Sequence, residues 1–128
     1  MVGRLRRRMR DLYDPSELTP SATSVLSRLS KSGPMTASEL AVAERVRPQS
    51  VAATLAVLDE HGLLERRRDP DDGRRQLITL SRAGGALVTD RRRAGEQWLA
   101  RSLQDHFTEA ERRTILEATA LLDRLADA

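Results

Sequence analysis

The stretch that most constrains the fold runs over residues 47–80 and reads RPQSVAATLAVLDEHGLLERRRDPDDGRRQLITL. Apolar residues recur at helical spacing in its first half. Gly62 follows, and glycine commonly closes a helix in the left-handed conformation. Two strand-like runs come next, ERRR at 65–68 and QLITL at 76–80, with proline and glycine in the turn between them. The pattern predicts a helix and a basic β-hairpin, which suits DNA because the helix fits the major groove and the hairpin tip reaches the backbone or minor groove.

A further short helix is expected just upstream. Thr36 and Glu39 have the spacing of a capping box at its start, and the helix is expected to end near Glu44. Pro48 then occupies a first-turn position of the next helix, where its missing N–H costs nothing. Two short helices joined by a few residues form a helix-turn-helix, and we interpret this region as one.

The outer face of the helix that begins at Pro48 is small and polar. Gln49 is able to pair with adenine, and Ser50 or Thr54 with bases or phosphates. Ala53 lies on the same side. The alternative is an ordinary solvated helix face. Small residues without Glu or Lys are less usual on such a face, and for this reason we favour contact with DNA.

The hairpin turn carries a candidate contact for the minor groove. Asp72 and Arg74 are two residues apart, so both can point the same way at the tip. Arg74 is placed to enter a minor groove, and Asp72 is placed to hold its guanidinium in a bidentate pair. A solvated charged turn is the alternative interpretation. The arginine run at 66–68 and the helix-turn-helix upstream argue against it.

Helices are expected on both sides of this unit. The Thr19-Pro20 pair opens one before it, and Ser81 caps a long one that reaches about residue 105. Residues 1–13 place a narrow apolar stripe among arginines, and Asp14-Pro15 ends this first helix. So basic a helix could contact DNA or a membrane surface, but we favour packing of its stripe on another helix.

The last helix, opened by a capping box of Thr108 and Glu111, has a wide apolar stripe that needs cover. The first helix is similarly short of partners within a single winged helix. We therefore expect a homodimer whose interface is formed by both chain ends. The predicted interface residues are Leu5, Met9, Leu12, Ile115, Leu121, Leu122 and Leu125.

Composition narrows the function further. The 128-residue chain has no Cys, which excludes disulfides, thiolate zinc sites and cysteine redox sensing. No apolar run approaches the ~20 residues that span a bilayer, and no signal-peptide core follows the basic start, so we expect a cytoplasmic protein. The net charge is +3 and Lys31 is the only lysine. Arginine suits nucleic acid, although a GC-rich genome would also favour arginine codons.

Nothing in the sequence predicts catalysis, a metal site or a cofactor. We find no nucleophile–base spacing, no glycine-rich phosphate loop and no cluster of metal ligands. His61 lies at a helix end, where histidine suits the helix dipole and is better explained as a capping-region residue than as a metal ligand. His106 is far from it in sequence. We therefore expect that the protein is not an enzyme.

Over nearly its whole length the chain resembles the MarR family of bacterial winged helix-turn-helix transcription regulators. The combination of motifs is fairly specific, although each fragment alone is weak. The matching segments are Leu18-Thr19, TASELA at 36–41, VAATLAVLDEHGLLER at 51–66, DPDDGRR at 69–75, and Leu80-Ser81 with Gly84. The chain departs from the family in its short first helix and its few aromatic residues.

The resemblance implies a homodimer that binds a palindromic operator, usually as a repressor, with recognition helices in successive major grooves and wings in the flanking minor grooves. It makes Arg74 the wing-tip arginine and Asp72 its partner. It also implies a small ligand, often phenolic or lipophilic, that binds between the dimerisation and DNA-binding parts and releases the DNA. Tyr13 and Trp98 are candidates to line such a pocket, with a core or interface position as the favoured alternative.

These patterns predict a mainly α fold with a small β-hairpin wing: a dimerisation helix at 1–18, a winged helix-turn-helix at 19–81 and further dimerisation helices at 82–128. The predicted function is sequence-specific regulation of transcription on double-stranded DNA. A winged helix used as a protein-interaction module is the alternative, and the arginine cluster argues against it. The predicted DNA-binding residues are Thr36, Ser38, Pro48, Gln49, Ser50, Ala53, Thr54, Arg66, Arg68, Asp72, Arg74 and Arg75.

Overall fold

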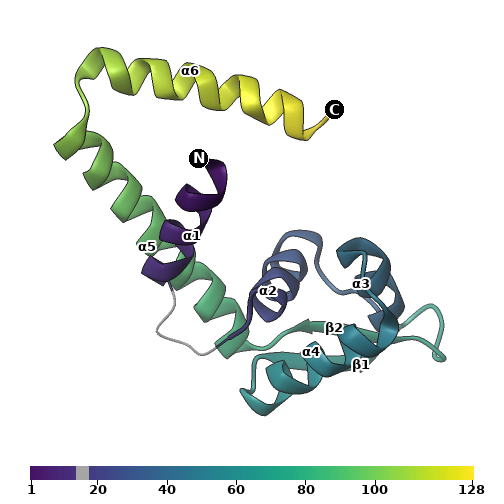
Figure 1. The fold of residues 1–128 in the computed structure, drawn as a ribbon. Coiled ribbons are helices and arrows are strands. Elements are labelled where there is room, and N and C mark those ends of the chain that lie inside the picture. Colours follow the sequence, from purple (N-terminus) through teal and green to yellow (C-terminus); the bar gives the residue numbers. More distant parts are fainter. Residues whose placement is uncertain (14–17) are drawn as a thin grey trace. The chain divides into compact units, whose positions relative to one another are not determined.

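The computed structural model describes residues 1–13 and 18–128, without the side chains of Leu12 and Tyr13. The expected end of the first helix at Asp14-Pro15 lies outside the described residues. The mainly α fold with a hairpin wing is confirmed (Figure 1). Its elements are α1 (Val2–Tyr13), α2 (Pro20–Ser32), α3 (Ala37–Glu44), α4 (Pro48–Glu60), β1 (Leu64–Arg68), β2 (Gln76–Leu80), α5 (Arg82–His106) and α6 (Glu109–Ala126).

The chain divides into two compact units, which we name the winged-helix unit (Met1–Arg92) and the C-terminal unit (Arg93–Ala128). Helix α5 begins in the first unit and ends in the second. The regional boundaries predicted at residues 18 and 81 remain a prediction. None of the helices in the described part of the chain is both long and apolar enough to cross a membrane.

Local capping explains where several helices begin and end. The Thr19 hydroxyl accepts a hydrogen bond from the amide of Ala22 at 3.2 Å, and Pro20 occupies the first turn of α2. Gly62, with φ 68°, follows α4 in the left-handed region expected of a closing glycine. At the start of α6, Thr108 and Glu111 form the complete capping box that the sequence predicts.

The capping box predicted at the start of α3 forms only in part. The Thr36 hydroxyl accepts a hydrogen bond from the amide of Glu39 at 3.1 Å, as expected. The Glu39 carboxylate, however, accepts from the Thr36 hydroxyl, at 3.1 Å, and not from the Thr36 amide. This carboxylate also accepts from the guanidinium of Arg75 in the hairpin. Because the Glu39 carboxylate is also bound by Arg75, it does not accept from the Thr36 amide as a complete capping box requires.

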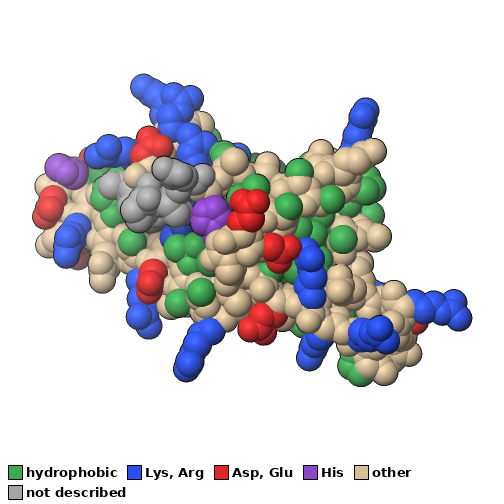
Figure 2. Space-filling view, turned by 90° about the horizontal axis from the view of Figure 1, so that it is seen from below, with side chains coloured by type: hydrophobic (Ala, Val, Ile, Leu, Met, Phe, Trp, Pro, Cys, Tyr) green, Lys and Arg blue, Asp and Glu red, His purple; other side chains and the backbone are tan. Residues whose placement is uncertain are grey.

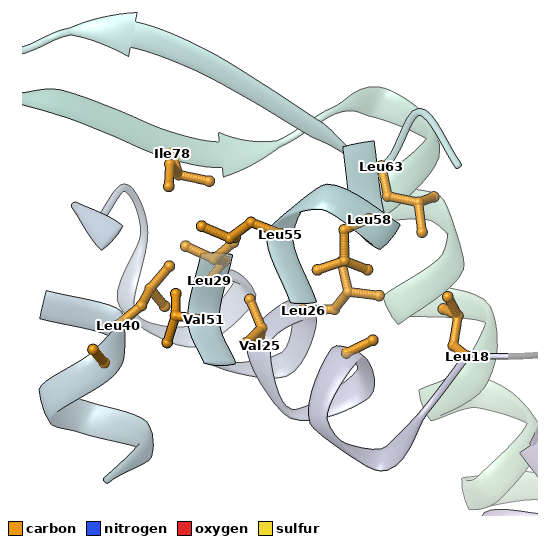
Figure 3. Close-up of a cluster of buried hydrophobic side chains, with 12 residues drawn as sticks. Leu18, Val25, Leu26, Leu29, Leu40, Val51, Leu55, Leu58, Leu63 and Ile78 are labelled. Atoms are coloured by element: carbon orange, nitrogen blue, oxygen red, sulfur yellow. The ribbon is translucent and has the colours of Figure 1, made fainter. Parts of the chain in front are cut away.

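One cluster of apolar side chains holds the winged-helix unit together (Figure 3). Leu26 of α2, Leu40 of α3 and Leu58 of α4 are each at most 1% exposed, and Ile78 of β2 closes the cluster. Burying a side chain of this size stabilises the fold by about 1.5–3 kcal/mol. The cluster contains Leu18, Ala22, Val25, Leu26, Leu29, Leu40, Ala41, Val51, Leu55, Leu58, Leu63 and Ile78.

The hairpin is anchored through its second strand. β1 and β2 pair antiparallel with Leu64 opposite Leu80. On the other side of β2, Met35 and Ile78 form a backbone bridge, with the Met35 amide donating at 3.1 Å and the Ile78 amide donating at 2.8 Å. Because Met35 directly precedes the N-cap of α3, this bridge fixes the base of the hairpin to the helix-turn-helix.

A glycine allows α5 to approach the start of the hairpin closely. A Cβ atom at Gly84 would lie 2.2 Å from the carbonyl oxygen of Leu63. Ser81 closes the same corner, because its hydroxyl donates to the Gly62 carbonyl at 2.6 Å and accepts from the Gly84 amide at 3.1 Å. The predicted cap at Ser81 is confirmed, and the glycine three residues later is explained by the absence of space for a side chain.

Candidate nucleic-acid interface

Helix α4 has one buried face and one exposed face, as the sequence predicts. Val51 and Leu58 on the buried face are at most 2% exposed. Pro48, Gln49 and Ser50 at its first turn are exposed. An exposed face of this size and polarity can lie close to base edges in a major groove, where Gln reads adenine and Ser bonds to several bases.

Ala53 and Thr54 have less capacity to form hydrogen bonds with DNA than the residues in the first turn of α4. Ala53 is exposed and small, so it permits close approach without a hydrogen bond. Thr54 is half-buried, and its hydroxyl donates to the Ser50 carbonyl at 3.0 Å. The Thr54 oxygen therefore keeps only acceptor capacity toward an external group. A phosphate oxygen only accepts hydrogen bonds, so it would have to replace the Ser50 carbonyl as the acceptor of the Thr54 hydroxyl. Contact of Thr54 with bases or phosphates stays a prediction.

The turn before α4 carries two arginines that the sequence pattern did not single out. Arg45 has a left-handed backbone with φ 55°, and Arg47 is the N-cap of α4 without a side-chain capping bond. Both are exposed. Their charge lies at the amino end of α4, where the helix dipole also favours an anion. The signal available in the sequence was their position on either side of the turn, just ahead of Pro48.

Aspartates order the backbone at the wing tip. The Asp69 carboxylate accepts from the amide of Asp71 at 2.9 Å, and the Asp72 carboxylate accepts from the amide of Arg74 at 3.1 Å. Pairing of Asp72 with the Arg74 guanidinium, which the sequence suggests, stays a prediction. An aspartate two residues before an amide is well placed to cap a turn. The Arg74 side chain is exposed and is left to meet an external partner.

Two predicted DNA contacts are engaged within the chain. Arg66 of β1 pairs with Asp59 of α4 at 2.8 Å. Arg75 pairs with Glu39 of α3 and, at 3.7 Å, with Asp69. These ion pairs join the hairpin to both helices of the helix-turn-helix. Contact of Arg66 or Arg75 with DNA stays a prediction, and a phosphate would have to compete with these carboxylates.

The other predicted contacts differ in exposure. Arg68 and Ser38 are exposed, whereas Thr36 is half-buried and caps α3.

Figure 2 shows basic side chains projecting into solvent at the right-hand end of the view, the end at which Figure 1 shows the hairpin. A shallow hollow of about 330 Å³ lies between the helix-turn-helix and the hairpin. It is lined by Ala37, Ala52, Leu55, Ala56, Asp59, Arg66, Gln76 and Ile78.

The residues predicted for a dimer interface expose apolar surface. Leu5 of α1 is 49% exposed, and Met9 and Ile115 are half-buried. The side chain of Leu12 lies outside the described residues. Exposure is largest on α6, at Leu121 (61%), Leu122 (61%) and Leu125 (70%).

One of the two candidates for a ligand pocket has a described side chain. Trp98 is half-buried, and the side chain of Tyr13 lies outside the described residues. Across residues 1–13 and 18–128, no group of three or more His, Cys, Asp or Glu side chains is arranged to hold a metal ion.

Comparison with known proteins decides the family. A family model described as MarR family matches residues 16–75. HTH-type transcriptional regulators of Mycobacterium bovis and Mycobacterium tuberculosis are each 37% identical to the chain over 126 residues, which is 98% of this chain and 87% of theirs. The chain belongs to the MarR family. This MarR-family protein is a DNA-binding transcription regulator and not an enzyme, as the sequence predicts.

Solved structures agree with this assignment. The crystal structure of a Pseudomonas aeruginosa protein described as a transcriptional regulator matches with a TM-score of 0.89 at 35% identity, covering 99% of this chain and 89% of that chain. A variant of S. aureus MepR bound to an oligodeoxyribonucleotide has a TM-score of 0.76 at 20% identity, over 97% of this chain and 91% of that chain, and shares the fold.

Proposed function

We propose that this MarR-family regulator is a homodimer that binds a palindromic operator and acts as a repressor. The observation that carries the proposal is an exposed, small polar helix face beside an exposed wing arginine in one winged-helix unit. In the proposed complex, α4 enters a major groove and Arg74 enters the neighbouring minor groove. The S. aureus MepR variant, which has the same fold, is bound to an oligodeoxyribonucleotide, and this supports the proposed use of the fold.

The exposed residues divide into two kinds of contact in this proposal. Gln49 and Ser50 would read base edges, because they are exposed at the first turn of α4. Arg45, Arg47 and Arg68 would meet phosphates, which fix the register of the protein without reading sequence. Most of the specificity is therefore assigned to one helical turn, and most of the salt dependence to the arginines around it.

The exposed leucines of α6 support the homodimer. A palindromic operator presents two half-sites about one helical turn apart, ~34 Å, so two recognition helices must be held at that spacing. An apolar stripe with 61–70% exposure at Leu121, Leu122 and Leu125 is better covered by a second copy than left in water. Leu5 and Met9 of α1 would contribute to the same interface.

A small ligand would act through this spacing. It releases the operator only if it binds better to a dimer arrangement in which the two α4 helices no longer match the DNA repeat. Trp98 and Tyr13 remain the sequence-based candidates for such a pocket. A ligand that binds both arrangements equally would leave DNA affinity unchanged.

The deciding experiment is a fluorescence-anisotropy titration of the purified protein with duplex DNA from the intergenic region upstream of its gene. Scrambled DNA of equal length is the control, at two salt concentrations. We expect tight binding to the intergenic duplex and weaker, strongly salt-dependent binding to the scrambled one. Sedimentation of the protein alone should give the mass of a dimer. Equal, weak binding to both duplexes would instead support the protein-interaction module.

The wing has its own test in Arg74→Ala. This substitution should weaken binding to the intergenic duplex by about 1–3 kcal/mol, because the guanidinium is lost from the minor groove. The matched control is Arg113→Ala, which removes the same charge from an exposed site on α6. The circular dichroism spectrum should be unchanged in both variants. If the two variants bind equally well, the wing does not dock on DNA.

A further inference from the structure

The carboxylate of Glu39 is placed to hold the wing against α3. Glu39 lies in the first turn of α3, and its carboxylate accepts from the Thr36 hydroxyl at 3.1 Å and from the Arg75 guanidinium. Arg75 is held on its other side by Asp69, whose carboxylate is 3.7 Å from Nε. The backbones of the same two residues are joined, since the Asp69 amide donates to the Arg75 carbonyl at 2.9 Å. Arg75 is thus fixed between the hairpin and α3.

The base of the hairpin is already secured by other contacts. The Met35–Ile78 bridge joins β2 to the segment before α3, and Arg66 of β1 pairs with Asp59 of α4 at 2.8 Å. Glu39 contacts the hairpin nearer its tip, directly beside Arg74. It is therefore the contact that can set the direction of the wing tip relative to the helix-turn-helix.

We propose that Glu39 is a positioning residue for DNA recognition, which holds Arg75 and thereby sets the Arg74 side chain for the minor groove. The inference rests on the proposed docking of the wing. It also assigns Arg75 to the protein and not to a phosphate. The Glu39 and Arg75 side chains are 45% and 47% exposed, and exposed ion pairs add little to fold stability. The benefit is expected in binding, because a wing tip that is already ordered loses less entropy on the DNA.

The sign of the effect separates this role from simple electrostatics. DNA is a polyanion, so removal of a carboxylate from a DNA-facing surface should strengthen binding if the carboxylate is only a bystander. If Glu39 positions the wing, Glu39→Gln should weaken specific binding although it removes a negative charge. Asp71→Asn is the matched control, because it makes the same charge change at an exposed position on the wing.

The test compares Glu39→Gln, Arg75→Gln and Asp71→Asn in anisotropy titrations with the intergenic duplex and with scrambled DNA. We expect Glu39→Gln and Arg75→Gln to weaken binding to the intergenic duplex by about three- to tenfold. Binding of Glu39→Gln to scrambled DNA should be unchanged or tighter. Asp71→Asn should bind both duplexes at least as well as the unmodified protein. The double variant that carries Glu39→Arg and Arg75→Glu reverses the ion pair. It should bind the intergenic duplex more tightly than either of these two substitutions alone.

Two results would overturn the proposal. One is a Glu39→Gln variant that binds like Asp71→Asn. The other is an Arg75→Gln variant whose slope of log affinity against log salt falls by about one, because such a change marks a lost phosphate contact. Arg74→Ala, measured in the same titrations, distinguishes failure of the proposed wing docking from failure of the positioning role of Glu39. An unchanged affinity there overturns wing docking together with this proposal, whereas a loss in Arg74→Ala without a loss in Glu39→Gln overturns the positioning role alone.

Discussion

The two units of this protein use the same kind of side chain in opposite ways. The leucines of α2, α3 and α4 lie in the core of the winged-helix unit, where Leu40 and Leu58 are 0% exposed. Helix α6 of the C-terminal unit has no buried residue, and Leu122 and Leu125 are 61% and 70% exposed. A helical stripe of leucines therefore predicts that a face will be covered, but not whether its own chain covers it.

The C-terminal unit relies more on local interactions. α6 has a capping box, and the Thr114 and Thr119 hydroxyls donate to carbonyls one turn back at 3.1 and 2.8 Å. Isolated helices of this length are marginal in water, and most helical stability in proteins comes from packing of an apolar face. The winged-helix unit buries leucines of its own helices, whereas the apolar stripe of α6 is exposed in the single chain.

The largest expected effect comes from truncating one leucine in each unit. Leu58→Ala should lower the free energy of unfolding by about 2–5 kcal/mol, because it leaves a cavity in the core. Leu122→Ala removes the same atoms from an exposed position and should cost about 0.5 kcal/mol or less in a monomer. Urea unfolding at two protein concentrations measures both. If a second copy covers α6, the loss of unfolding free energy caused by Leu122→Ala should rise with protein concentration. Equal losses in Leu58→Ala and Leu122→Ala would contradict the difference between the two units.

A charge on α6 tests what covers it. Leu122→Glu should weaken self-association by about a hundredfold or more, because an unpaired carboxylate cannot enter an apolar interface without a large penalty. Sedimentation velocity should then show a monomer with an unchanged circular dichroism spectrum. Ala120→Glu places the same charge on the opposite side of the helix and should leave the dimer intact. A stable dimer of Leu122→Glu would remove α6 from the interface.

Adjacent glycines probe the close packing of the winged-helix unit. Gly84→Ala should lower stability by about 1–3 kcal/mol, since the new Cβ would lie 2.2 Å from the Leu63 carbonyl oxygen, a backbone atom that cannot rotate away. At Gly85, a Cβ meets nothing within 4 Å, so Gly85→Ala should stabilise the helix by about 0.5–1 kcal/mol. Thermal unfolding of both variants measures the difference. Similar melting temperatures would show that α5 can move away without cost.

The smallest expected effect is a pH dependence at the start of α6. Hydrogen bonds from the backbone amide and then the side chain of Thr108 lower the pKa of the Glu111 carboxyl below its usual value. Because the pKa is lowered in the folded state, the ionised Glu111 carboxylate stabilises the protein fully above the ordinary glutamate pKa of about 4.3. This stabilisation is lost as pH falls through the pKa of the folded state. An NMR titration of the Glu111 carboxyl should show this, and Thr108→Ala should return its pKa toward the ordinary value. An unshifted pKa in the unmodified protein would contradict the cap.

Much of the candidate site could be predicted because its signals are local. Pro48 and Gly62 bracket α4, and the glycine and proline of the turn separate two strands, all within short distances along the chain. The spacing of Val51 and Leu58 then determines which face of α4 is buried, and so which face is left for DNA. Arg45 and Arg47 were missed because their importance comes from their place at the turn and not from any apolar period.

The sequence by itself determined the helices, the hairpin, their caps and the exposed face of α4, because each depends on interactions within a few residues. Only the tertiary structure decided the partners of the arginines. Arg75 and Glu39 are 36 residues apart, and Arg66 meets Asp59 across two different elements. The approach of Gly84 to Leu63 likewise depends on how α5 packs against the hairpin. A charge in the sequence has many candidate partners, and it is the folded backbone that brings one carboxylate within reach and leaves Arg74 to the solvent.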